Sequence, residues 1–250
     1  MSERASFVAV VLAAGLGKRM GSDLPKVLHV ALGRPLVHHV LDQIEPLQPA
    51  RAIVVVGHRA SLVRESLAGR EVRCVEQKPQ LGTGHAVQVA WPHVGTDIGT
   101  LLILAGDMPL VRTSTLRGLL ARHAREGNAV TFISGVLDDP TGYGRVIRGP
   151  GGEFLKIVEE RDATPAERAV TEVNSGVYCF ARNPLEEALG FLRADNRQGE
   201  YYLTDTLLYL RGRGLPVGIE MAADARELLG VNTPDQLRQV EDVLSGRGKR

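Results

Sequence analysis

The stretch VAVVLAAGLGKRMGSDLPK, residues 8–26, decides how this chain is interpreted. Residues 7–12 form a continuous apolar run, which predicts a strand buried on both faces. Small residues follow at 13–17, where the backbone can come close to a ligand and adopt unusual dihedral angles. Exposed backbone N–H groups beside fixed cations suit a polyphosphate. We therefore expect a nucleoside triphosphate to bind here, beside the cations Lys18, Arg19 and Lys26.

Two commoner phosphate loops do not fit this stretch. The dinucleotide fingerprint needs G-x-G-x-x-G, but Gly15 and Gly17 are followed by Gly21, one residue too late. A P-loop needs Ser or Thr after Gly17-Lys18, where this chain has Arg19. A dinucleotide-dependent oxidoreductase is therefore disfavoured. Taken alone, the stretch is also compatible with a glycine turn carrying solvated surface charges.

The composition is that of a globular protein. Of 250 residues, 44% are hydrophobic and 24% charged, and the formal net charge of +1 argues against a nucleic-acid partner. Cys74 and Cys179 lie far apart within apolar runs, which indicates free buried thiols in a reducing compartment. No apolar run reaches transmembrane length, and the N-terminus lacks a targeting pattern. We expect a cytoplasmic protein with no membrane or nucleic-acid partner.

Strand-like and helix-like segments alternate in the first half. Strands are predicted at 7–12, 52–56, 72–75, 100–104 and 129–134, with apolar residues at helical spacing over 36–44 and 116–120. This alternation predicts an α/β fold: a Rossmann-like, mostly parallel sheet with helices on both faces. Ligands bind at the carboxyl ends of such strands. The glycine loop and Gly106-Asp107 both follow a strand, so we expect them to meet at one crevice.

Residues 138–181 read differently. They are rich in turns and strands, and Pro150-Gly151-Gly152 is a hairpin signal, so we expect a small antiparallel flap over the crevice. A final helix is predicted after Thr233, with Gln236 closing a capping box. We expect one domain, 1–250, divided into a nucleotide-binding part (1–135), a second part that includes the flap (136–232) and a C-terminal helix and tail (233–250).

Asp107 carries the next piece of chemistry. A lone carboxylate at the end of a buried strand suits Mg²⁺, which prefers one or two carboxylates together with substrate phosphates. By itself this residue could also be a turn or helix-cap aspartate. Its expected position beside the phosphate loop favours the metal interpretation.

Several motifs together resemble a known family. The segment 12–26 is similar to the signature of sugar-1-phosphate nucleotidylyltransferases. Later motifs resemble the uridylyltransferase domain of the bifunctional bacterial uridylyltransferase/acetyltransferases that make UDP-N-acetylglucosamine. The likeness runs from about residue 8 to about 244. The later motifs are QLGTGHA at 80–86, PTGYGR at 140–145, QGEYYLTD at 198–205 and GVN at 230–232.

The resemblance implies a role for each matching position. The cations grip the triphosphate and the sugar phosphate, and Mg²⁺ is held by one carboxylate and one amide. By this likeness, the catalytic residues are Arg19, Lys26 and Asp107, and the metal ligands are Asp107 and Asn232. The nucleotide-binding residues are Ala13, Ala14, Gly15, Gln77, Gly82 and Thr83. The sugar-binding residues are Gly144, Glu159, Asn174 and Thr204.

Elementary chemistry supports some of these roles and offers alternatives for others. Gln77 has an amide donor and a carbonyl acceptor that can pair with a pyrimidine edge. Thr83 precedes a helical pattern and could instead be its N-cap. Glu159 could accept bonds from sugar hydroxyls or be a solvated acid at a strand end. Asn232 could be only a turn residue.

The family implies transfer of UMP from UTP to N-acetylglucosamine 1-phosphate. The attacking phosphate oxygen is already ionised, so positioning and charge neutralisation should suffice, without a general base. The alternatives are glucose-1-phosphate uridylyl- or thymidylyltransferase activity, or a non-catalytic regulatory subunit that binds nucleotide sugars. Many relatives carry an aromatic residue at the position of Ala105. Nothing after Arg238 resembles the hexapeptide repeats of the relatives' trimer-building β-helix, so we expect no acetyltransferase activity and no such trimer.

Overall fold

Strand β1 (Phe7–Ala13) lies inside the main sheet, as its continuous apolar run predicts. The structure is a computed structural model that describes residues 6–247. β1 pairs in parallel with β4 (Arg51–Val56) on one side and β6 (Thr100–Ala105) on the other. Beyond β4 lies β5 (Arg73–Glu76), also parallel. The strands predicted at 7–12, 52–56, 72–75 and 100–104 are confirmed, with some ends shifted by one residue.

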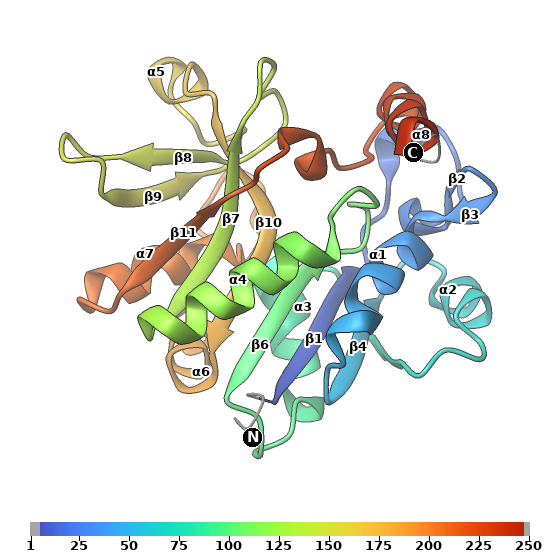
Figure 1. Ribbon diagram of the computed structural model, residues 1–250, viewed down its shortest axis with the longest axis horizontal. Helices are drawn as coiled ribbons and strands as arrows, with labels where there is room; N and C mark the ends of the chain where they lie inside the picture. Colours follow the sequence, from blue (N-terminus) through green and yellow to red (C-terminus); the bar gives the residue numbers. More distant parts are fainter. Residues whose placement is uncertain (1–5, 248–250) are drawn as a thin grey trace.

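Alternate side chains of β1 enter two separate cores. Val8 and Val10 pack on the face covered by α3, α6 and α7, whereas Ala9 and Val11 pack on the face covered by α1, α2 and α4. Figure 1 shows α1 and α4 in front of the sheet and α3 behind it. Successive side chains of a strand point to opposite faces, so an apolar run requires both layers. The predicted covering of both faces is confirmed. The helices are α1 (Leu36–Ile44), α2 (Ala60–Ser66), α3 (Thr83–Ala90), α4 (Thr113–Glu126), α6 (Arg182–Phe191) and α7 (Thr204–Gly212).

The antiparallel region contains a hairpin and one strand that belongs elsewhere. β8 (Arg145–Arg148) and β9 (Phe154–Val158) form the hairpin, and Gly152 N–H donates to the Gly149 carbonyl in its turn, as predicted. β10 (Glu172–Ala181), expected in the flap, instead inserts into the main sheet between β6 and β7 (Val130–Val136), antiparallel to both. The physical reason is burial: Cys179 enters one core and Phe180 the other. β10 therefore ties the flap to the central sheet.

The second half of the chain adds an edge strand and a C-terminal helix. β11 (Val217–Met221), which the sequence pattern did not reveal, pairs in parallel with β7, and the sheet order is β11-β7-β10-β6-β1-β4-β5. α8 (Pro234–Arg247) packs near β2 (Val30–Ala31), which forms a small antiparallel sheet with β3 (Arg34–Pro35). The shorter helices are α5 (Pro165–Arg168), η1 (Lys18–Met20), η2 (Lys26–Leu28), η3 (Glu45–Leu47), η4 (Trp91–His93) and η5 (Ala225–Leu228).

The start of α8 confirms part of the predicted capping box. The backbone N–H of Gln236 donates to Thr233 Oγ1 over 3.2 Å, as an N-cap requires. The Gln236 side chain, however, accepts from the N–H of Asn232 over 2.8 Å, one residue before the cap. This hydrogen bond fixes the backbone of Asn232, the residue that the family resemblance implies as a metal ligand.

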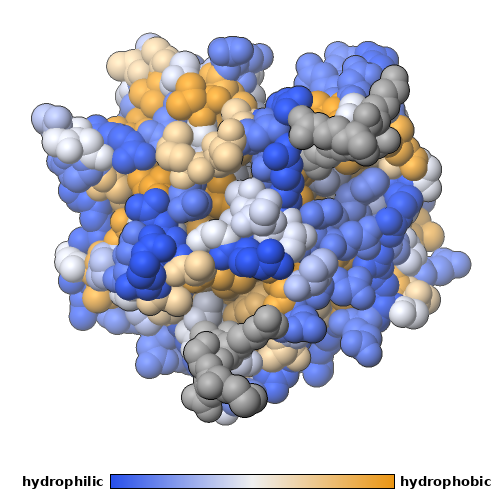
Figure 2. Space-filling model, viewed as in Figure 1, coloured by the Kyte–Doolittle hydropathy of each residue, from blue (hydrophilic) through white to orange (hydrophobic). Residues whose placement is uncertain are grey.

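The surface and the cysteines complete the description. In Figure 2 hydrophobic side chains gather at the upper left of the visible face, over the region of β7 and the hairpin, where Val136 is 53% exposed. Within residues 6–247, no helix has both the length and the apolar character needed to cross a membrane. Cys74 and Cys179 are free, as predicted; Cys179 is buried and Cys74 half-buried.

Candidate functional site

The loop after β1 folds back so that its two ends meet. Gly17 adopts the left-handed conformation at φ 61°, and a Cβ built there would lie 3.0 Å from Lys26 Cβ. Only glycine meets both requirements without strain. The loop thus brings Lys26, on η2, beside Gly15, whose built Cβ would lie 4.0 Å from Lys26 Cε. The side chain of Lys18 lies outside the described residues.

Lys26, Asp107 and Asn232 converge on one point although they are far apart in the sequence. The Lys26 ammonium forms an ion pair with Asp107 Oδ2 and donates to Asn232 Oδ1 over 2.9 Å. The ion pair is shielded from solvent, because the Lys26 and Asp107 side chains are only 19% and 12% exposed. Lys26, expected to neutralise phosphate charge, is therefore in direct contact with Asp107 and Asn232, the two metal ligands that the family resemblance implies.

Backbone hydrogen bonds hold the two oxygen donors in place. Gly106 N–H donates to the Leu12 carbonyl over 2.9 Å, which fixes the turn after β6 against the end of β1. Val231 N–H donates to the Asp107 carbonyl, also over 2.9 Å, so the 230–232 segment is attached to the same turn. The two strand ends thus meet at one crevice, as predicted from their positions at the carboxyl edge.

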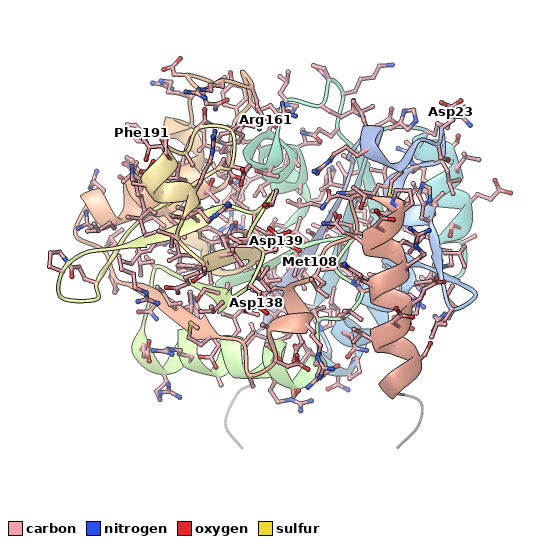
Figure 3. The ribbon with its side chains drawn as sticks, turned by 90° about the horizontal axis from the view of Figure 1, so that it is seen from above. Asp23, Met108, Asp138, Asp139, Arg161 and Phe191 are labelled. Carbon is pink, nitrogen blue, oxygen red and sulfur yellow. The ribbon has the colours of Figure 1, made fainter. Side chains whose placement is uncertain are left out.

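A pocket of about 200 Å³ opens beside this cluster. Its walls come from the carboxyl ends of β1 and β6, from the 142–144 loop, from β10 and from the start of α7. Figure 3, which looks down on this edge, places Met108, one of the lining residues, near the middle of the view. Seven predicted site residues line the pocket: Thr83, Asp107, Gly144, Glu159, Asn174, Thr204 and Asn232.

Glu159 is a half-buried carboxyl in the wall of this pocket. Burial raises the pKa of Glu159, and the charges of nearby acids raise it further. The Thr204 hydroxyl, which donates to Glu159 Oε1 over 3.0 Å, acts in the opposite direction and lowers that pKa. Gly144 lies against it, since a Cβ there would come within 3.5 Å of Glu159 Oε2. Glu159 follows the end of β9 directly and lies half-buried in the pocket wall, so it is not a fully solvated acid. Glu159 faces inward with acceptor oxygens toward the pocket walls.

A bulge in β10 shapes the opposite wall. The pairing register of β10 with β7 shifts between Asn174 and Tyr178, and Gly176 sits there at φ 82°. Asn174 Nδ2 donates to the Tyr178 hydroxyl over 2.6 Å, and Asn174 N–H donates to the Gly144 carbonyl over 2.9 Å. Two predicted sugar-binding residues are thus joined directly.

The predicted base-binding loop is attached to the segment before α7. Gln77 Nε2 donates to the Gly82 carbonyl over 2.9 Å, which connects two of its members. Gly82 has φ 104°, and a Cβ there would lie 2.7 Å from the Tyr201 carbonyl oxygen. Thr83 Oγ1 accepts from Leu203 N–H over 2.9 Å. The N-cap of α3 is Gly82, not Thr83, because the helix already begins at Thr83; the Thr83 hydroxyl makes this long-range bond and does not cap the helix.

The remaining predicted residues surround the entrance. Ala13 and Ala14 are buried at the end of β1, and the Ala14 carbonyl accepts from Gln80 Nε2 over 3.3 Å. Arg19 is exposed and reaches toward the 140s loop, since a Cβ on Gly142 would lie 3.8 Å from Arg19 Nη1. Arg19 therefore lies beside the 140s loop and does not line the pocket.

Two tyrosines at this site escaped the sequence reasoning. The Tyr143 hydroxyl accepts from Gly230 N–H over 3.2 Å, which links the 140s loop to the segment carrying Asn232. Burial raises the pKa of Tyr143, so its phenol stays neutral. Tyr143 lies within the quoted PTGYGR motif, which was a usable signal. Tyr178 lies in an apolar strand, where no local pattern distinguishes it from a core residue.

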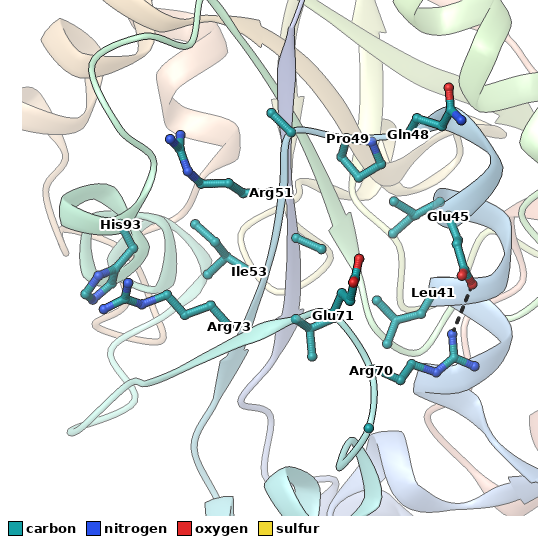
Figure 4. Close-up of a pocket in the computed structure, with 15 residues that line it drawn as sticks. Leu41, Glu45, Gln48, Pro49, Arg51, Ile53, Arg70, Glu71, Arg73 and His93 are labelled. Carbon is teal, nitrogen blue, oxygen red and sulfur yellow. Dashed lines mark ion pairs between the residues drawn. The ribbon is translucent and has the colours of Figure 1, made fainter.

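A larger cavity lies elsewhere. It has about 820 Å³ and opens at the amino ends of β4 and β5, between α1 and the 69–73 turn (Figure 4). Arg70 there pairs with Glu45, and Arg51, Arg73 and His93 lie on another side of it. None of the predicted site residues lines this cavity.

The donor set at the Lys26 cluster fits a divalent cation. Mg²⁺ takes hard oxygen ligands, and a carboxylate oxygen and an amide oxygen converge here. A positive charge, the Lys26 ammonium, already lies against both of them. Among the described residues, no group of three or more His, Cys, Asp or Glu side chains offers a separate metal site.

Comparisons with known proteins agree with this geometry. The chain is 49% identical over 236 residues to the "Bifunctional protein GlmU" of Paracidovorax citrulli, matching 93% of this chain and 49% of that protein. It is 47% identical over 240 residues to the protein of the same name from Alkaliphilus oremlandii, matching 96% of this chain and 52% of that protein. The chain thus spans about half the length of the curated relatives it matches.

Solved structures show the same fold at low identity. The inositol-1-phosphate CTP transferase from T. maritima superposes with a TM-score of 0.73 at 19% identity, covering 97% of this chain and 96% of that one. A nucleotidyl transferase from Methanothermobacter thermautotroptrophicus gives a TM-score of 0.66 at 21% identity, covering 98% and 100%. Residues 9–198 match the family described as "MobA-like NTP transferase domain". This chain belongs to that NTP transferase family.

Proposed function

We propose that this protein transfers UMP from UTP to N-acetylglucosamine 1-phosphate, producing UDP-N-acetylglucosamine and pyrophosphate. The observation that carries the proposal is the convergence of Lys26, Asp107 and Asn232 between the β1 loop and a pocket lined by Glu159, Asn174 and Thr204. The relatives named GlmU support it, as does the family match. The assigned roles of the individual residues belong to this proposal.

In the proposed reaction, a phosphate oxygen of the sugar phosphate attacks the α-phosphorus of UTP. The new P–O bond forms as the α–β bridging bond breaks, and pyrophosphate leaves with that electron pair. The attacking oxygen is ionised at neutral pH, so this step moves no proton. The barrier lies in bringing two anions together, which Lys26 and Arg19 reduce by neutralising phosphate charge and fixing the reactants in line.

Nucleotidyltransferases of this family typically use a divalent metal, and we assign Mg²⁺ to the oxygens of Asp107 and Asn232. When bound, the ion supplies positive charge and a template for phosphate oxygens. Glu159 accepts hydrogen bonds from sugar hydroxyls, with Thr204 orienting its carboxyl, and Gly144 and Asn174 hold the acetamido end. Gln77, Gly82 and Thr83 read the uracil, and Ala13, Ala14 and Gly15 contact the nucleotide through their backbone.

A small substrate matrix tests the proposal. Pyrophosphate release is measured with UTP, CTP and dTTP against the 1-phosphates of N-acetylglucosamine and glucose, each with Mg²⁺. The proposal expects the fastest release with UTP and N-acetylglucosamine 1-phosphate. Faster release with glucose 1-phosphate assigns the alternative sugar, and Ala105, which lines the pocket, is then the first residue to examine. No release with any pair overturns the catalytic proposal and favours a regulatory subunit.

The setting of the reaction is part of the same proposal. Free Cys74 and Cys179 suit a reducing compartment, so we place the enzyme in the cytoplasm. We retain as proposals the division into parts 1–135, 136–232 and 233–250 and the absence of nucleic-acid, membrane and β-helix partners.

A further inference from the structure

The two oxygens proposed to hold the metal are both in contact with the Lys26 ammonium. Asp107 Oδ2 forms its ion pair with Lys26, and Asn232 Oδ1 accepts from the same nitrogen over 2.9 Å. The Lys26 ammonium therefore occupies the point between the Asp107 carboxylate and the Asn232 amide oxygen. One cation at that point excludes another, because like charges at contact distance repel strongly.

The parts of this contact differ in how firmly they are held. The backbones of Asp107 and Asn232 are fixed by the bonds from Val231 N–H to the Asp107 carbonyl and from Asn232 N–H to Gln236 Oε1. Lys26, the residue after Pro25, reaches them with a flexible four-carbon side chain. When a second cation arrives, the Lys26 side chain is the part that can move.

Charge decides what can displace Lys26. With Lys26 in place, the charges of Asp107 and Lys26 cancel, so a free divalent cation meets no net electrostatic attraction. To bind, it must also break the ion pair between the Lys26 ammonium and the Asp107 carboxylate. Among the described residues, Asp107 is the only acid with which Lys26 forms an ion pair. A triphosphate supplies the missing anion, because its oxygens can take the ammonium that Asp107 releases.

We infer that Lys26 is a built-in placeholder for the metal, so that the site takes up a divalent cation as its complex with a nucleoside triphosphate and rejects the free ion. This inference rests on the proposed function, since it takes Asp107 and Asn232 as the metal ligands. It adds a second role to a residue otherwise assigned only to phosphate binding. The ligand class is the metal–triphosphate complex, and Lys26 passes from Asp107 to phosphate as that complex binds.

The test measures metal affinity without turnover. Mn²⁺ is titrated into the nucleotide-free protein and followed by electron paramagnetic resonance of the free ion. The wild type should bind Mn²⁺ weakly. Lys26→Met, which removes the charge but keeps the stem, should bind it about tenfold more tightly or better, the scale expected from removing one adjacent like charge. Lys156→Met is the matched control, since Lys156 pairs with Glu167 away from the site, and its Mn²⁺ affinity should equal that of the wild type.

Two further measurements sharpen the result. Adding Asp107→Asn to Lys26→Met should abolish the gain, because the extra affinity depends on that carboxylate. Lys26→Met should at the same time weaken UTP binding in calorimetry, so one substitution moves the two affinities in opposite directions. Lys26→Gln serves as a second uncharged variant, and thermal unfolding confirms that each protein is folded.

An unchanged or weaker Mn²⁺ affinity in folded Lys26→Met and Lys26→Gln overturns the inference, as does a gain that survives Asp107→Asn. These outcomes leave the proposed reaction intact if the wild type still forms UDP-N-acetylglucosamine. Absence of product in the substrate matrix, by contrast, overturns the proposed function. The Mn²⁺ titrations would still show whether Lys26 and the metal ion compete for Asp107.

Discussion

At the scale of single residues, Asp107 is the negative charge on which the cluster depends. Gly106 separates it from the end of β6, and its carbonyl accepts a hydrogen bond from Val231 N–H. Asp107→Asn keeps the size of the side chain but loses the charge that pairs with Lys26 and, in the proposed reaction, the metal. We expect kcat with saturating Mg²⁺ to fall on the order of a hundredfold or more. A coupled pyrophosphate assay measures it.

The control for this substitution is Asp138→Asn. Asp138 is an exposed acid on the 138–144 loop and does not line the pocket. Its loss should change kcat less than twofold, about what a screened surface charge contributes. Near-normal turnover of Asp107→Asn would remove Asp107 from the catalytic assignment.

Asp205 gives a prediction about pH. Burial, reinforced by the charge of Asp162, raises the pKa of Asp205 to about 6 from the ordinary 3.8. The folded state therefore holds this proton more tightly than the unfolded chain, so the ionised carboxyl destabilises the fold as pH rises through about 6. Asp205→Asn should raise the free energy of unfolding by about 1 kcal/mol near pH 8, allowing for partial exposure, and by nothing near pH 4.

Urea denaturation at the two pH values measures the effect, with exposed Asp195→Asn as the reference. An equal change at both pH values would show that the effect of Asp205→Asn does not come from its ionisation.

At the scale of elements, two helical glycines separate packing from propensity. A Cβ on Gly84 in α3 would collide with Leu192 Cδ1 and lie 3.0 Å from the Tyr201 carbonyl oxygen, whereas a Cβ on Gly190 in α6 meets nothing within 4 Å. Gly84→Ala should lower the free energy of unfolding by about 1–3 kcal/mol through overpacking. Gly190→Ala should leave it unchanged or raise it by up to about 1 kcal/mol.

Chemical denaturation of the two variants measures whether the free energy of unfolding falls in Gly84→Ala and stays the same or rises in Gly190→Ala. Gly84→Ala should also raise the KM for UTP, because α3 begins in the loop proposed to read the base. Equal stability of the two variants would mean that the contact between α3 and the 201–203 segment is looser than the structure has it.

At the scale of the whole molecule, an ion pair joins two segments that are far apart in the sequence. Glu227 on η5 is 2% exposed, accepts from Arg112 N–H over 3.0 Å and pairs with Arg112 Nε at 3.4 Å. This anchors the segment that runs on to Asn232. Glu227→Ala should lower the free energy of unfolding by about 2–3 kcal/mol, since it removes a buried carboxylate and leaves the Arg112 N–H and part of its guanidinium without that partner.

Arg226→Ala on the same short helix is the comparison. Arg226 is 63% exposed and pairs with Asp224 at the surface, so its loss should cost less than about 1 kcal/mol. Thermal unfolding of the two variants ranks them. A Glu227→Ala protein as stable as Arg226→Ala would mean that η5 is held by its apolar contacts alone.

Local pattern was enough for the parallel half of the sheet and not for the other half. The continuous apolar run at 7–12 is satisfied by a buried strand. The apolar residues at helical spacing over 36–44 are satisfied by an amphipathic helix. β10 has the same kind of apolar run, but nothing local tells whether it joins the flap or the central sheet. β11 is short and partly exposed, so its local sequence does not indicate a strand, and its extended conformation depends on pairing with β7.

The chain by itself determined which chemistry is available: a glycine loop with cations after one buried strand, a carboxylate after another, and the small residues at Gly17 and Gly82 that such turns require. These follow from local dihedral and burial preferences, which neighbouring residues carry. Only the tertiary structure decided that Lys26 lies between Asp107 and Asn232, that the Thr83 hydroxyl serves Leu203 rather than its own helix, and that Glu159 faces inward. Those contacts join residues tens to hundreds of positions apart, and their geometry exists only once the sheet order is set.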